Sequence, residues 1–191
     1  MVAMIMLMAA QDRVDTHVHL QGRGGQDYSE TAKRLVERMD KLGIGKAILL
    51  PPPRATEEQR TTDYRDCLAM ARKHPGRLHF VGGGDLLNPM IQKIAPDQVT
   101  REVRAEFERR AEEIVKAGAR GFGEMTALHL SLEEGHPFEE APPDHPLFLL
   151  LADIAAEHDM PIDIHLEAAL EDQPLPKNLE GRSSKNPARI A

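Results

Sequence analysis

Short apolar segments alternate five times along the chain with longer segments whose apolar residues recur at helical spacing. This alternation is typical of a parallel sheet in which a helix connects each strand to the next. The sequence predicts strands at 14–20, 46–50, 78–81, 119–125 and 161–166, and helices at 28–42, 62–74, 97–117 and 146–158. The expected fold class is therefore α/β, with about five parallel strands and flanking helices.

Polar residues on one face of the end strands help to choose between an open doubly wound sheet and part of a barrel. These residues are Asp15, His17 and His19 in the first strand, and Asp163, His165 and Glu167 at the fifth. Helices cover both faces of a doubly wound sheet, so its strands are apolar on both faces. A (β/α)₈ TIM barrel instead holds a polar site at the carboxyl ends of its strands. We therefore expect a partial barrel.

Spacing and length indicate how much of a barrel the chain contains. The expected strands recur often enough that eight units would need roughly 300 residues, inside the usual range for this fold. The chain has 191 residues, which is room for five units. We expect residues 12–191 to form one incomplete barrel domain that lacks its C-terminal strands.

Composition excludes several classes of function. Lys and Arg number 24 against 31 Asp and Glu, for a net charge of −7, and there is no Trp. An acidic chain without a basic cluster is poorly suited to nucleic acid, where neutralisation of phosphates dominates affinity. Cys67 is the single cysteine, so intrachain disulfides and paired-cysteine metal knuckles are excluded. No apolar run reaches the roughly 18 residues of a membrane span.

The first eleven residues need a separate interpretation. Residues 1–10 are all apolar and are followed by Gln11, Asp12 and Arg13. The stretch has the apolar core and small-residue end of a secretory signal but lacks its basic start. Residues 1–11 are thus an apolar leader or a signal remnant. The signal interpretation predicts a secreted or periplasmic protein, and the leader interpretation a cytoplasmic one.

His17 and His19 are the strongest sign of chemistry in the sequence. Two histidines at i and i+2 of a strand point the same way and can bind one ion, and imidazole suits zinc and other late first-row metals. His165 and Glu124 stand at the ends of the fifth and fourth strands and complete a possible metal shell. The alternative is a hydrogen-bonded core histidine, and for Glu124 an arginine pair or a substrate contact.

Other features permit simpler explanations. Three glycines at 82–84 indicate a tight turn after the third strand. His129, His136 and His145 follow the fourth strand. His129 is a candidate substrate contact, although all three could be solvated loop histidines, and His145 could instead begin a helix.

The sequence resembles the amidohydrolase superfamily, in particular its amidohydrolase-related branch of metal-dependent TIM-barrel hydrolases. The resemblance rests on DTHVH at 15–19, GFGEMT at 121–126 and PIDIHL at 161–166, and it extends over residues 12–171. It implies that His17, His19 and His165 bind a divalent metal, with zinc favoured, and that Glu124 is a ligand, a bridge between two metals or a catalytic group. One or two ions and a small-molecule substrate are expected.

The same resemblance implies residues that this chain does not supply. The family takes a further histidine from its sixth strand and, from its eighth, an aspartate that serves as the base. Both positions would lie beyond Ala191. We therefore expect a truncated hydrolase that is inactive alone and could form homo-oligomers through its open strands. The alternatives are a non-oxidative decarboxylase of aromatic acids, a non-catalytic α/β binding module, or a vestigial fragment.

Overall fold

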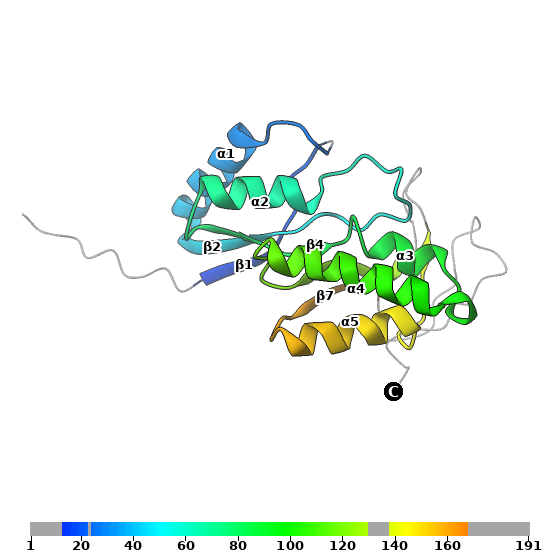
Figure 1. Cartoon of the computed structure of the whole chain (residues 1–191). Helices are drawn as coiled ribbons and strands as arrows, with labels where there is room; N and C mark the ends of the chain where they lie inside the picture. Colours follow the sequence, from blue (N-terminus) through cyan, green and yellow to red (C-terminus); the bar gives the residue numbers. More distant parts are fainter. Residues whose placement is uncertain (1–12, 23, 130–137, 168–191) are drawn as a thin grey trace, which may run out of the picture.

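Strands and helices alternate along the chain as the sequence predicts (Figure 1). The computed structural model describes residues 13–22, 24–129 and 138–167, so the expected leader at 1–11 lies outside the described residues. The elements are β1 (Arg13–Val18), α1 (Ser29–Leu42), β2 (Ile44–Leu49), α2 (Tyr64–Lys73), β3 (Leu78–Phe80), β4 (Gly82–Gly83), α3 (Asn88–Lys93), the 3₁₀ helix η1 (Pro96–Gln98), α4 (Arg101–Lys116), β5 (Phe122–His129), β6 (Glu139–Glu140), α5 (Pro146–Glu157) and β7 (Ile162–Leu166). Each of the five expected strands and four expected helices is present.

The main strands pair in the order in which they occur along the chain. β2 pairs in parallel with β1 and β3, and β5 pairs in parallel with β4 and β7. β3 and β4 are separated only by Val81, whose N–H donates to the Leu49 carbonyl, while the Gly82 N–H donates to Gly121. The fold is therefore mixed α/β with parallel strands, as predicted. The described strands do not close into a barrel.

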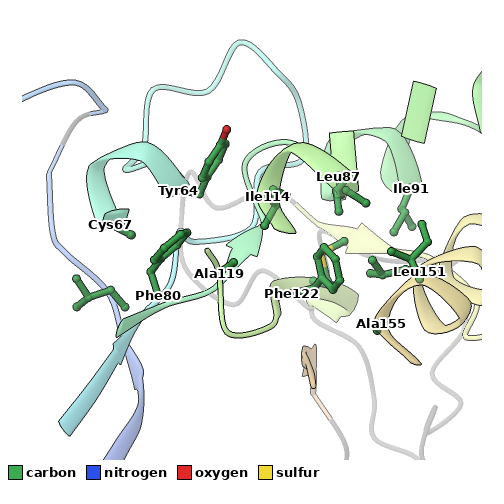
Figure 2. Packing of buried hydrophobic residues seen from close by; sticks show 14 of the residues in the cluster. Tyr64, Cys67, Phe80, Leu87, Ile91, Ile114, Ala119, Phe122, Leu151 and Ala155 are labelled. Atoms are coloured by element: carbon green, nitrogen blue, oxygen red, sulfur yellow. The ribbon is translucent and has the colours of Figure 1, made fainter. Parts of the chain in front are cut away.

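The core lies between the sheet and its helices. Helices α1, α2 and α4 contact β2, β3 and β4 respectively, and α5 packs against α4. In Figure 2, Phe80 and Phe122 from the sheet lie among the helical side chains of Cys67, Ile114 and Leu151. All five residues are buried. None of the described helices combines the length and apolar character needed to cross a membrane.

The glycines at 82–84 bring strands close together, which corrects the expected tight turn. Gly82 and Gly83 form β4, and the turn occupies residues 84–87. A Cβ on Gly84 would lie 2.7 Å from the carbonyl oxygens of both Glu124 and Pro51. Only glycine permits this approach of three backbone segments, one of which carries Glu124.

Candidate metal centre

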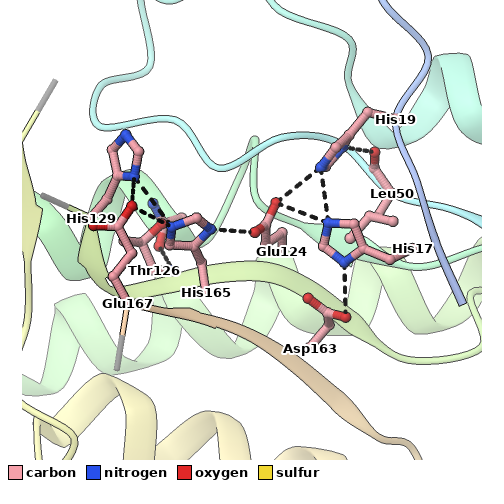
Figure 3. A network of polar contacts seen from close by, with 10 residues as sticks. His17, His19, Leu50, Glu124, Thr126, His129, Asp163, His165 and Glu167 are labelled. Carbon is pink, nitrogen blue, oxygen red and sulfur yellow. Dashed lines mark hydrogen bonds and ion pairs between the residues drawn. The ribbon is translucent and has the colours of Figure 1, made fainter. Parts of the chain in front are cut away.

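Polar side chains gather at the carboxyl ends of β1, β5 and β7. His17 lies in β1 and His19 directly beyond it, Glu124 and His129 lie in β5, and Asp163 and His165 lie in β7 with Glu167 directly beyond. The carboxyl ends of parallel strands meet at one edge of a sheet, so residues from three distant segments converge there (Figure 3). The alternation within each strand keeps these groups off the face that forms the core.

Three ligand atoms from β1 and β5 form a compact group, which we call the Glu124 triad: His17, His19 and Glu124. The Nε2 atoms of His17 and His19 are 3.1 Å apart. Oε2 of Glu124 is 3.1 Å from Nε2 of His19 and 3.8 Å from Nε2 of His17. The Glu124 side chain is only 5% exposed, whereas that of His17 is 45% exposed. The triad therefore has a buried base and an open side.

Hydrogen bonds behind the two imidazoles determine which ring nitrogens carry protons. Nδ1 of His19 lies 3.0 Å from the Leu50 carbonyl oxygen, and Nδ1 of His17 lies 3.3 Å from Oδ2 of Asp163. A carbonyl or carboxylate oxygen only accepts, so each Nδ1–H is the donor. In the neutral rings, both Nε2 atoms then carry a lone pair. Three electron-rich atoms thus face one another.

The charges of the triad follow from its contacts. Burial alone would raise the pKa of Glu124, but hydrogen bonds with His19 and His165 outweigh burial and hold that pKa below its usual value. Burial alone would lower the pKa of His19, but contacts with Glu124 and the Leu50 carbonyl outweigh burial and raise it. The site therefore holds an ionised carboxylate and attracts positive charge, whether a proton or a metal ion.

His165 is joined to this triad through Glu124 and takes part in a second group. Its Nδ1 lies 2.7 Å from Oε1 of Glu124. Its Nε2 lies 3.2 Å from Nδ1 of His129 and 3.6 Å from Oε1 of Glu167. We call His129, His165 and Glu167 the His129 triad. The four residues that the sequence assigns to one metal shell are brought together, but they are divided between two groups.

Sequence reasoning gave no role to two carboxylates of the site. Asp163 and Glu167 flank His165 on the polar side of β7, and that alternation was the available signal. The backbone oxygen of Leu50 left no signal in the sequence. His145 begins α5, where its Nδ1 accepts from the Leu147 N–H at 3.1 Å, so the helix-start alternative is confirmed. His136 lies outside the described residues.

The Glu124 triad fits a divalent metal by both donor type and spacing. Two imidazoles and a carboxylate are a donor set that zinc takes in catalytic sites. Around a tetrahedral ion with bonds of about 2.1 Å, ligand atoms lie about 3.4 Å apart. The three separations of 3.1, 3.1 and 3.8 Å lie on both sides of that value. Metal-binding histidines also commonly donate their other N–H to a carbonyl or carboxylate, as both histidines do here.

Comparison with known proteins gives one distant similarity. No family model matches the chain, and no curated protein matches it. Among solved structures, a probable 2-pyrone-4,6-dicarboxylic acid hydrolase from Acinetobacter baumannii, crystallised with citric acid bound, aligns at 14% identity and a TM-score of 0.43. The alignment covers 80% of this chain and 49% of that protein, so the chain spans about half of its length.

Proposed function

We propose that the chain belongs to a metal-dependent hydrolase of the amidohydrolase type, in which the Glu124 triad holds a divalent ion, with zinc preferred. The observation that supports this proposal is the convergence of two Nε2 lone pairs and a carboxylate oxygen within 3.8 Å of one another. Acceptor atoms held so close repel each other unless a cation lies between them. An arrangement of this kind supports a cation site better than a structural hydrogen-bond network.

The surrounding residues prepare the site without taking part in the reaction directly. The Leu50 carbonyl and Asp163 fix the orientation of His19 and His17. His165 donates to Oε1 of Glu124, which leaves Oε2 directed at the histidines. The exposed side of His17 leaves space for a small-molecule substrate. When bound, a divalent ion supplies Lewis-acid chemistry, lowering the pKa of a coordinated water and polarising a carbonyl group.

We propose in addition that the fold is part of a (β/α)₈ barrel. The parallel strands follow one another in chain order, without the reversal of order that characterises a doubly wound sheet. The polar groups stand at the carboxyl ends of the strands, where sites on TIM barrels are built. Both features support a barrel-type mouth around the Glu124 triad.

The experiment that tests the metal assignment measures binding of zinc by the purified chain. Equilibrium dialysis followed by elemental analysis compares the wild type with a His17→Ala/His19→Ala double variant. We expect the double variant to lose one equivalent of zinc, while a His74→Ala control, changed at the residue after α2, keeps the wild-type amount. Unchanged zinc in the double variant would refute the assignment.

A second measurement addresses the reaction class. The zinc-loaded chain is incubated with esters, lactones and aromatic acids, and both hydrolysis and release of carbon dioxide are followed. Hydrolysis that disappears in the double variant supports the hydrolase. Carbon dioxide release that disappears in the same variant would replace the hydrolase by a decarboxylase.

A further inference from the structure

A second set of ligand atoms lies beside the Glu124 triad and has no part in the function proposed above. Nδ1 of His129 is 3.2 Å from Nε2 of His165 and 3.2 Å from Oε1 of Glu167, and the last two atoms are 3.6 Å apart. All three side chains are partly buried. These separations again lie around the value of about 3.4 Å expected between ligands of a tetrahedral ion.

The contact with Glu124 determines the state of His165. Because the Glu124 carboxylate accepts, the Nδ1–H of His165 is the donor of their 2.7 Å hydrogen bond. Nε2 of the neutral ring then presents a lone pair to His129 and Glu167. A single proton on Nδ1 of His129 points well at only one of these two acceptors, whereas a cation contacts all three atoms at once.

A buried carboxylate next to the triad is an independent observation that favours a cation. Glu139 in β6 stands opposite His129 in the antiparallel pairing of β6 with β5. Its residue is 3% exposed, and neither carboxylate oxygen has a hydrogen-bond partner within the described ranges. Burying a carboxylate without donors is costly unless positive charge lies close by or the group is neutral. A cation held by the neighbouring His129 triad would supply that positive charge.

We propose that the His129 triad is a second cation site, which takes a late first-row divalent ion such as zinc. Its donors are two imidazole nitrogens and one carboxylate oxygen, a set that suits these ions better than calcium or magnesium, which prefer oxygen ligands. The ion is held between the ends of β5 and β7, with Glu139 behind it. The site does not depend on the proposed function, because none of its three ligand atoms belongs to the Glu124 triad.

The test counts zinc sites with variants that change one triad at a time. Isothermal titration with zinc, combined with elemental analysis, should give two equivalents for the wild type. His129→Ala should leave one equivalent, which the His17→Ala/His19→Ala variant then distinguishes as that of the Glu124 triad. Glu167→Gln keeps the side-chain shape and should weaken one site by about tenfold or more. Glu140→Gln, an exposed position on β6, is the matched control and should change nothing.

The outcomes separate this inference from the proposed function. If both His129→Ala and Glu167→Gln keep the wild-type stoichiometry and affinity, the second site is refuted, and the histidines form only a hydrogen-bonded pair. If the wild type binds one equivalent that His129→Ala removes and the His17→Ala/His19→Ala variant keeps, the second site stands and the proposed function fails. Zinc-dependent thermal stabilisation, recorded for each variant, confirms that any remaining site is on the folded chain.

Discussion

Nδ1 of His17 lies 3.3 Å from Oδ2 of Asp163, although the two residues belong to the first and last strands of the parallel order. Neighbouring strands are about 4.8 Å apart, so the four steps from β1 to β7 would span about 19 Å in a flat sheet. Two side chains cannot bridge that distance and still touch. The sheet must therefore curl strongly, and the His17–Asp163 contact joins its two ends.

Replacing Asp163 by Asn should weaken zinc binding at the Glu124 triad without removing the site. The amide accepts a weaker hydrogen bond from His17 and no longer fixes which nitrogen of the ring is protonated, and losses of this kind cost about 10- to 100-fold in metal affinity. Competition titration with a zinc indicator measures the change. Asp153→Asn, on the exposed face of α5, is the control. Equal affinities for the two variants would contradict the role given to Asp163.

Replacing Glu124 by Gln should remove the ion of the Glu124 triad and spare that of the His129 triad. The amide keeps the volume of the buried side chain but removes the charge that faces His19. Elemental analysis after zinc loading should fall from two equivalents toward one. If zinc content holds while turnover falls, Glu124 is a substrate contact. If neither changes, its role is structural.

Asp85 makes the stability of the chain depend on pH. Burial, followed by the negative charge of Asp63, raises the pKa of Asp85 to about 6, and Arg54 offsets this only in part. In the unfolded chain the same group titrates near its usual value of about 3.9. Between these two pKa values the folded state binds more protons than the unfolded state, so stability falls as pH rises from about 4 to 6.

The variant Asp85→Asn removes this titration. Each unit of pKa shift corresponds to about 1.4 kcal/mol, so we expect the variant to be about 1–3 kcal/mol more stable than the wild type at pH 8 and similar to it at pH 4. Urea unfolding at the two pH values measures the difference. Asp97→Asn, at an exposed position, should follow the wild type. A stability difference that is equal at both pH values would contradict the assignment.

Replacing Gly84 by Ala should destabilise the fold and disturb the site together. The new Cβ would meet the carbonyl oxygens of Glu124 and Pro51, and backbone atoms cannot move aside as a flexible side chain does. Overpacking of this kind costs about 1–3 kcal/mol. Thermal unfolding measures the loss of stability, and zinc titration measures the effect on the Glu124 triad. An unchanged melting temperature with unchanged zinc affinity would show that the strands separate without cost.

The strands and helices were predictable because the periodicity of apolar residues reports directly which face each element buries. The pairing of His17 with His19 was predictable for the same reason, since residues at i and i+2 of a strand share a side. α3 was missed because a helix of six residues is too short to show a repeat. β6 was missed because its two residues pair only through tertiary contact with the end of β5.

The division of the polar residues into two triads was beyond sequence reasoning. The sequence places His165 at the same mouth as His17 and His19, but the side-chain conformation decides which neighbours its ring contacts. Each nitrogen of His165 faces a different carboxylate, and no spacing rule encodes that choice. The role expected for His129 as a substrate contact stays a prediction, and its place beside His165 adds a second one.

The carboxylate of Glu124 serves both triads, with Oε2 toward His19 and Oε1 toward His165. An occupant of one triad therefore changes the electron density and orientation of a group on which the other depends. Thermodynamic linkage requires this influence to be reciprocal: if zinc at the first triad alters the affinity of the second by some factor, zinc at the second alters the first by the same factor. Protons obey the same relation, so the mouth titrates as one coupled system rather than as separate histidines.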